Sequence, residues 1–189
     1  SGKSTLLKLI SGDYNASSGE ILFLNKNIKD WDLIKIARSR SVLPQSNHLS
    51  FPFSVLNIVK MGRYPLKTDN TAEHEEKICL EILNSFDLGS HINQNYLTLS
   101  GGEKQRVQLA RIVAQLYSDE NNYHDKLLIL DEPTSYLDIK HQSILFDLLH
   151  SMNSKGLTIL MVLHDLNHAM LHSKKTIMLK RSELIAFGK

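Results

Sequence analysis

Residues 97–111 read LTLSGGEKQRVQLAR, the most specific pattern in the chain. Ser100-Gly101-Gly102 precedes a run of helix-forming residues, with Glu103 in the expected first turn, where an acid suits the helix dipole. An ordinary N-cap explains Ser100 but not two consecutive glycines, each of which costs up to ~1 kcal/mol inside a helix. Backbone N–H groups at a glycine-flanked helix start form an anion site. The stretch therefore predicts a helix whose start binds an anion.

The segment LLILDEPTS at residues 127–135 is a second chemical motif. Four apolar residues predict a buried strand that ends at two adjacent acids, Asp131 and Glu132. Ligands of parallel sheets bind outside the carboxyl ends of the strands. Asp131 suits Mg²⁺ held beside phosphates, usually through water, and Glu132 is placed to polarise an attacking water. A solvated turn is the competing explanation for adjacent acids, and it weakens if the chain also carries a phosphate motif.

Such a phosphate motif occurs at residues 1–12, which read SGKSTLLKLISG. Gly2-Lys3-Ser4-Thr5 matches the second half of G-x-x-x-x-G-K-[ST], in which a glycine-rich loop cradles phosphates. The first glycine of that pattern would precede Ser1, so we expect the chain to be truncated at its N-terminus, inside the loop. Because the missing N–H groups do much of the phosphate binding, we expect this fragment to bind phosphates poorly.

Strand and helix patterns alternate along the chain. Short apolar runs separated by helices indicate a mainly parallel sheet covered on both faces. The sequence therefore predicts an α/β fold, a single domain over residues 1–189 with a helical subdomain inserted at about 50–118. Strands are expected at 19–25, 41–44, 126–130, 157–163, 175–180 and 184–187, and helices at 3–10, 31–38, 54–62, 72–86, 100–117, 139–152 and 165–172.

Composition excludes several classes of protein. A hydrophobic content of 42% allows a sizeable core, and a net charge of +2 gives no reason to expect nucleic acid or an anionic membrane as a partner. The single cysteine, Cys79, excludes a disulfide framework, and its apolar neighbours at helical spacing predict a small buried side chain. His164, His168 and His172 share a helical face, but no acid or thiol pattern accompanies them, so we expect no metal there.

At the motif LSGGEKQRVQLAR the chain resembles the ATP-binding-cassette (ABC) ATPases, and further positions match this family one by one. Gln45, at the end of SVLPQ, matches the glutamine of the Q-loop. SYLD after the carboxylates resembles the D-loop, with Asp138 as its acid and Tyr136 where a small residue is common. His164 in MVLHDLN matches the switch histidine. All of these elements occur in family order, so the resemblance implies a P-loop NTPase core and the cofactors ATP and Mg²⁺.

The resemblance assigns the nucleotide to the phosphate motif. The residues implied in nucleotide binding are Ser1, Gly2, Lys3, Ser4 and Thr5. Lys3 would reach the β- and γ-phosphates, and the hydroxyl of Ser4 would bind Mg²⁺.

The resemblance also implies a catalytic group. Gln45 and Asp131 would complete the surroundings of Mg²⁺ and water, so that the metal ligands are Ser4, Gln45 and Asp131. Glu132 would orient or deprotonate the water. His164 would contact the γ-phosphate.

In this family the signature covers the ATP of the other protomer in a head-to-tail homodimer. The residues implied in this contact are Ser100, Gly101, Gly102 and Glu103. Hydrolysis would therefore require dimerisation, and a change in the signature would disable the partner's site.

The segment SVLPQSNHLSFPFSVLNIVKMGRYP, residues 41–65, resembles the importer branch for iron chelates, cobalamin and haem. Three details favour haem: LSFPF after the Q-loop, VQLARIVAQLY, and the polar insertion SDENNYHD before the strand of Asp131. This resemblance implies a transmembrane permease, a periplasmic or surface substrate-binding protein reached through it, and a peripheral position on the cytoplasmic face of the inner membrane.

Other interpretations remain open. Siderophore or cobalamin import is the nearest alternative. A soluble ABC protein of DNA repair or translation is an alternative of another class, although only 54 residues (46–99) separate Gln45 from the signature and carry no sustained heptads. A catalytically inactive remnant is the third.

Overall fold

A three-stranded parallel sheet forms the centre of the computed structural model, which describes residues 2–45, 49–66, 70–117 and 122–188. Its order is β3 (Arg40–Leu43), β4 (Leu127–Asp131) and β5 (Thr158–Val162). Along the middle strand, Leu128, Ile129 and Leu130 are fully buried. Burial on both faces explains why this strand is a continuous apolar run rather than an alternating one.

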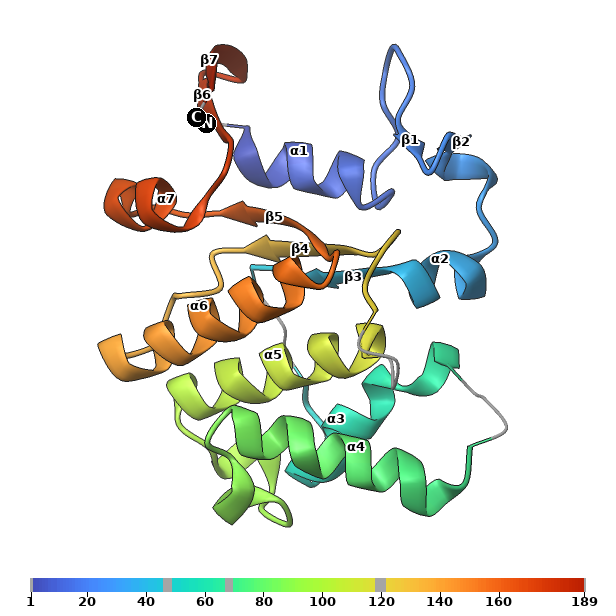
Figure 1. Cartoon of the computed structure of the whole chain (residues 1–189), viewed down its shortest axis with the longest axis vertical. Helices are drawn as coiled ribbons and strands as arrows, with labels where there is room; N and C mark the ends of the chain where they lie inside the picture. The colour runs from blue at the N-terminus through green and yellow to red at the C-terminus, as the bar shows by residue number, and fades with distance from the viewer. Residues whose placement is uncertain (1, 46–48, 67–69, 118–121, 189) are drawn as a thin grey trace.

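Helices cover both faces of this sheet (Figure 1). On one face lies α1 (Lys3–Ile10), where Leu7 packs in a cluster with Ile129 and Val162. On the other face lie α5 (Gly101–Leu116) and α6 (Ile139–Ser154). The α/β prediction with a parallel sheet covered on both faces is therefore confirmed.

Helix α5 is tied to the sheet by a buried polar contact as well as by packing. Gln115 accepts a hydrogen bond from Ser41 Oγ at 2.9 Å. Its amide nitrogen donates to the carbonyls of Ala37 and Arg40 at 2.8 and 3.0 Å. Because both ends of the amide are satisfied, the contact fixes the position of α5 against β3 without leaving a buried polar atom unpaired.

Three helices pack on one another within the segment for which a helical subdomain is predicted. They are α3 (Val55–Gly62), α4 (Ala72–Ser85) and α5. A Cβ added at Gly62 would lie 2.1 Å from the carbonyl oxygen of Arg111, so the main chains of α3 and α5 touch at this point. Arg63 then crosses to α4, where its side chain forms two hydrogen bonds to the Glu75 carboxylate, at 2.6 and 3.1 Å.

Each helix after α1 has an N-cap residue whose side chain accepts a hydrogen bond from the first turn. Asp, Ser and Thr accept hydrogen bonds from the unpaired N–H groups of a first turn. The caps are Asp32 for α2 (Leu33–Ser39), Ser54 for α3, Thr71 for α4, Ser100 for α5, Asp138 for α6 and Asp165 for α7 (Leu166–His172).

Two antiparallel hairpins lie outside the parallel sheet. The first pairs β1 (Leu22–Phe23) with β2 (Lys26–Asn27), and Leu24 and Asn25 between them have positive φ. The strand expected at 19–25 is therefore much shorter than predicted, because the turn leaves only two residue pairs. The second hairpin pairs β6 (Thr176–Lys180) with β7 (Glu183–Gly188).

Short helical turns complete the chain. They are η1 (Ile28–Asp30), η2 (Tyr64–Leu66), η3 (Gly89–His91) and η4 (Tyr96–Thr98). Within the described ranges, no helix combines the length and the apolar character that crossing a membrane requires.

Candidate functional site

The start of α1 holds the residues of the phosphate motif. Gly2 stands before the first turn with φ of +86°, a conformation that favours glycine, and Lys3, Ser4 and Thr5 follow it. No side chain within the described residues caps this helix, so its first N–H groups have no side-chain partner, although Ser182 of the β6–β7 turn lies against Gly2. Such a helix start binds phosphate well. Ser1, also predicted to bind nucleotide, lies outside the described residues.

The start of α1 and the carboxyl ends of β4 and β5 lie at the same edge of the sheet (Figure 1, left). There Glu132 has φ of +54°, and its backbone N–H donates to the carbonyl of Val162 at 3.1 Å. This bond extends the pairing of β4 with β5 by one residue and fixes the direction of the Glu132 side chain.

Glu132 brings the three predicted catalytic residues together. Gln45 Nε2 donates to Glu132 Oε1 at 3.3 Å, and His164 Nε2 lies 2.5 Å from the same oxygen. The three residues follow the ends of β3, β4 and β5, so the parallel sheet assembles the group. Glu132 is 17% exposed and His164 67% exposed, which leaves the carboxylate within reach of a water molecule from one side.

Asp131 is the buried member of the carboxylate pair. It is 6% exposed, and its Oδ1 has no hydrogen-bond partner among the described residues. An unpaired buried carboxylate oxygen is costly, which makes it suited to a cation ligand. Ser4 approaches the same edge from α1, and Gln45 from β3. The three predicted metal ligands therefore come from elements that meet at one place, and the orphaned oxygen of Asp131 fits Mg²⁺.

The start of α5 is fully capped from within the chain. Ser100 Oγ accepts from the Glu103 backbone N–H at 3.4 Å, and Glu103 Oε2 accepts from the backbone N–H and the hydroxyl of Ser100, both at 2.7 Å. Glu103 Oε1 also lies 3.1 Å from His91 Nε2. The Ser100 hydroxyl and backbone N–H together hold the pKa of Glu103 below its usual value. Gly101 and Gly102 add backbone N–H groups to this helix start.

The D-loop packs directly on the signature. A Cβ added at Gly102 would lie 2.8 Å from the carbonyl oxygen of Tyr136, whereas one at Gly101 would lie 3.7 Å from the Tyr136 ring. Gly102 is therefore required by the neighbouring main chain. Asp138 follows two residues later and caps α6 by accepting from the His141 backbone N–H at 2.9 Å.

The signature and the D-loop together line a hollow of about 270 Å³. Sequence reasoning identified the signature residues and Asp138 but missed two other side chains of its lining, Arg106 and His141. His141 lies three residues after an N-cap, a spacing at which a polar side chain reaches back to the cap, and that signal could have found it. The lining residues are Ser100, Gly102, Glu103, Arg106, Tyr136, Leu137, Asp138 and His141.

Comparison with known proteins identifies the family. The family model described as ABC transporter matches residues 1–135. This chain belongs to the ABC transporter family. The hemin import ATP-binding protein HmuV of Escherichia coli O157:H7 is 40% identical over 189 residues, which are all of this chain and 72% of that protein.

Solved ABC cassettes share the fold. A dimeric bacterial ABC transporter cassette superposes with a TM-score of 0.85 and 29% identity, over 100% of this chain and 80% of its own. The same cassette in a post-hydrolysis dimer bound to ADP and Pi gives a TM-score of 0.82 at 25% identity, with the same coverage. The chain is thus an ABC transporter ATPase, a family that binds and hydrolyses ATP.

In this ABC ATPase the phosphate motif and the signature stand apart. Helix α1, with Lys3, lies on one face of the sheet, whereas α5, with the signature, lies on the other (Figure 1). Both helix starts lie toward the same edge. The phosphate motif and the signature are therefore separated by the sheet within this chain.

Two histidines of α7, His168 and His172, stack on Phe146 of α6. The ring of His172 stacks on Phe146 at 3.8 Å, and His150 Nε2 lies 3.0 Å from His172 Nδ1. No group of three or more His, Cys, Asp or Glu in the described part of the chain is arranged to hold a metal ion. Cys79 is fully buried, and burial raises the pKa of its thiol to about 11.

Proposed function

We propose that this ABC ATPase powers haem uptake through a partner permease. The observation that carries the catalytic part is the convergence of Gln45 and His164 on Glu132 at the carboxyl end of β4. The substrate part rests on the 40% identical relative, which is named a hemin import ATP-binding protein. The segment LSFPF, which either docks the permease or anchors a loop, and the polar insertion at 118–125, of which 118–121 lie outside the described residues, support the same assignment.

Nucleotide binding is assigned to the start of α1. Lys3 neutralises the β- and γ-phosphates as a point charge, while the outward N–H groups of the first turn donate to phosphate oxygens. Ser4, Gln45 and Asp131 would hold Mg²⁺, with the orphaned Oδ1 of Asp131 as the clearest ligand. When bound, Mg²⁺ supplies charge neutralisation on the phosphate oxygens. Thr5 lies in the same turn and is assigned to nucleotide binding with it.

Water activation is assigned to Glu132. The carboxylate accepts a proton from the attacking water, and Gln45 and His164 orient the carboxylate from its two neighbouring strand ends. His164 is exposed enough to turn from Glu132 toward a bound γ-phosphate. Glu132, Gln45 and His164 follow the ends of three adjacent strands, so the sheet already brings the three residues together.

The separation of the phosphate motif from the signature supports a head-to-tail homodimer. Because α1 and α5 lie on opposite faces of the sheet, the signature of one protomer is free to cover the nucleotide held by the other. Ser100, Gly101, Gly102 and Glu103 then contact ATP across the interface, and Asp138 of the D-loop lies beside them. One solved relative with this fold is dimeric in both of its structures.

The import function places the protein in a larger assembly. We infer a transmembrane permease, a periplasmic or surface binding protein that delivers haem to it, and a peripheral position on the cytoplasmic face of the inner membrane. Nucleic acid is not among the inferred partners. Siderophore or cobalamin import is the alternative substrate assignment, since the segment at 41–65 resembles all three importer groups.

The deciding experiment reconstitutes the full-length ATPase with the permease encoded beside it and measures ATP turnover. Binding proteins loaded with haem, siderophore or cobalamin are compared in the same vesicles. We expect stimulation by the haem-loaded protein alone. Stimulation by another chelate would reassign the substrate, and turnover without any permease dependence would favour a soluble ABC protein.

A further inference from the structure

The turn that ends helix α4 contacts both the signature and the first turn of α6, which directly follows the D-loop. At Asp87, which has φ of +57°, the carboxylate Oδ2 accepts a hydrogen bond from Lys140 Nζ at 2.8 Å and lies 3.6 Å from His141 Nε2. Four residues farther on, His91 reaches Glu103, the carboxylate that holds Ser100. Residues 86–91, which we call the α4 turn, therefore lie between the signature and the first turn of α6.

Arg106 fixes the α4 turn to the signature helix. Its Nη1 donates to the carbonyls of Phe86 and Asp87 at 2.9 and 2.8 Å, and the residue is only 9% exposed. Hydrogen bonds from a buried guanidinium are strong and directional. The α4 turn thus has a defined position relative to α5, from which Asp87 points toward α6.

His141 links this turn to the D-loop carboxylate. Its Nδ1 lies 2.7 Å from Asp138 Oδ1, the same oxygen that accepts the His141 backbone N–H at 2.9 Å. The backbone N–H holds the pKa of Asp138 below its usual value, with a further contribution from the ring. An ionised carboxylate only accepts, so the shared proton belongs to His141 Nδ1. The side chain is 16% exposed, and its Nε2 has no hydrogen-bond partner in the described ranges.

We propose that His141 is a positioning residue whose Nδ1–H holds the D-loop carboxylate Asp138 in place, so that the D-loop and the signature face the partner's nucleotide as one unit. The proposal rests on the proposed ATPase dimer. The charged groups around the ring are Asp138 and Asp87, with Lys140 and Arg106 beside Asp87. His141 itself contacts neither of the residues assigned to the nucleotide phosphates, Lys3 and Ser4, and acts only through Asp138.

Two substitutions of His141 distinguish the role of Nδ1 from that of Nε2. The amide nitrogen of asparagine lies close to the position of Nδ1, whereas that of glutamine lies close to Nε2. His141→Asn therefore keeps the donor to Asp138, and His141→Gln loses it. In the full-length ATPase with its permease, we expect His141→Gln to lower kcat about tenfold, the value of a hydrogen bond to a charged group, with KM for ATP unchanged. His141→Asn should stay within about twofold of the unsubstituted protein, because the donor to Asp138 is retained.

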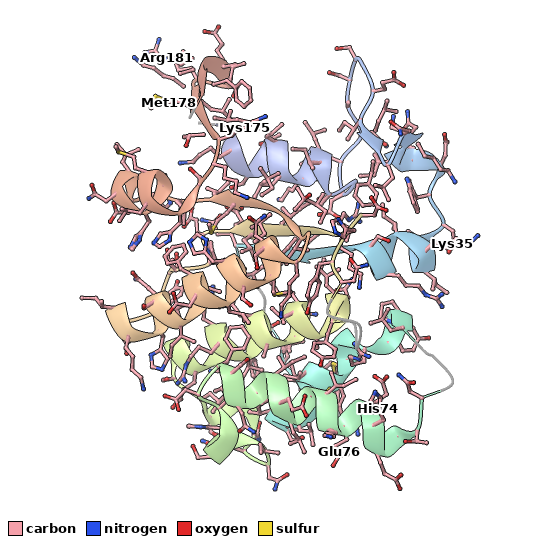
Figure 2. All side chains as sticks on the ribbon, in the orientation of Figure 1. Lys35, His74, Glu76, Lys175, Met178 and Arg181 are labelled. Atoms are coloured by element: carbon pink, nitrogen blue, oxygen red, sulfur yellow. The ribbon has the colours of Figure 1, made fainter. Side chains whose placement is uncertain are left out.

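The controls distinguish a positioning role from a structural one. His74→Gln makes the same chemical change in the first turn of α4, at the opposite end from Asp87 (Figure 2), and should leave kcat unchanged. Asp87→Asn, at a 57% exposed side chain whose positive φ suits asparagine, leaves the Nδ1 hydrogen bond to Asp138 in place and should keep kcat within about twofold of the unsubstituted protein. Thermal unfolding of each variant is recorded alongside turnover.

Each outcome is decisive. Loss of kcat in His141→Gln with recovery in His141→Asn supports the proposal. Equal kcat in both variants and the unsubstituted protein overturns it while leaving the ATPase assignment intact. Equal loss in both variants, in step with a lower unfolding temperature, also overturns it, because the role would then be structural. If the unsubstituted protein does not hydrolyse ATP, the proposed function fails and this proposal fails with it.

Discussion

The starts of helices α1 and α5 both present N–H groups to anions, but they are built in opposite ways. Helix α1 begins at Gly2 with no side-chain cap among the described residues. Helix α5 begins at Ser100 inside a complete capping box, with Glu103 held in turn by His91. One helix start has no side-chain cap, whereas at the other the Ser100 and Glu103 N–H groups are already paired within the chain.

This difference matches the two tasks assigned to them. The open start of α1 must bind phosphates within its own protomer, so a capping side chain there would compete with the ligand. The start of α5 must keep its shape until a second protomer arrives, and its capping box preserves that shape in the separate chain. The Ser100 hydroxyl donates to Glu103 in this state and would have to turn away from it to donate to a phosphate.

The largest expected effect, that of Glu132→Gln, distinguishes nucleotide binding from ATP hydrolysis. Glu132→Gln removes the carboxylate that would accept the proton. It keeps the size of the side chain and an oxygen that can accept from Gln45 Nε2. We expect kcat for ATP to fall about 10²- to 10⁴-fold, the usual contribution of a general base, with nucleotide affinity retained. Turnover is measured by phosphate release and affinity by equilibrium titration. Glu81→Gln, on the exposed side of α4, is the matched control, and an unchanged kcat in Glu132→Gln would refute the assigned role.

The next effect tests the open helix start. Lys3→Ala removes the point charge from the first turn of α1, and we expect nucleotide affinity to fall about 10- to 100-fold, the loss of one charged hydrogen bond. Lys8→Ala, in the last turn of the same helix, should leave affinity unchanged. A fluorescent ATP analogue reports both. Equal affinities in the two variants would mean that the phosphates bind elsewhere.

A smaller effect tests the contact of the signature with the D-loop. Gly102→Ala places a Cβ against the Tyr136 carbonyl, and we expect about 1–3 kcal/mol of lost stability from the forced backbone shift. Gly101→Ala meets only an ordinary ring contact at 3.7 Å, so its better helix propensity should leave stability equal or higher. Chemical denaturation without nucleotide measures both. Equal stability in the two variants would contradict the close approach.

The smallest effect concerns the capped start of α5. Ser100→Ala should cost about 1 kcal/mol of stability at neutral pH, the usual value of an N-cap. The Glu103 pKa is lowered in the folded protein from its ordinary 4.5, chiefly by the Ser100 hydroxyl. The contribution of ionised Glu103 to folding stability is therefore fully present above pH 4.5 and lost as the pH falls through the lowered pKa. The difference in unfolding free energy between Ser100→Ala and the unsubstituted protein should shrink in acid, and a constant difference would exclude Glu103 as the partner.

Elements that depend on local sequence were predictable, and those that depend on distant contacts were not. The buried strand before Asp131 is a continuous apolar run, and the helix expected at 31–38 is found as α2, so both were confirmed. The short extent of β1 escaped prediction because its apolar residues continue into a turn. The sequence also named Gln45, Glu132 and His164, but their catalytic roles stay predictions although the structure brings them together.

His91 and Arg106 could not be identified in the same way. Each is a polar residue on a helix or turn whose partner lies 12 to 20 positions away, as in the pair His91 and Glu103. Periodicity assigns such residues to a face of a helix but says nothing of what meets that face. Only the packing of the α4 turn on α5 decides it.

The main-chain contact between α3 and α5 limits which residues can replace Gly62. A side-chain clash can be relieved by a smaller partner, which leaves a pair of covarying positions. The atom that a Cβ at Gly62 would meet is the carbonyl oxygen of Arg111, and every amino acid at position 111 carries that carbonyl. No second-site substitution there can make room. Position 62 should therefore remain glycine without a covarying partner wherever α3 and α5 keep this crossing.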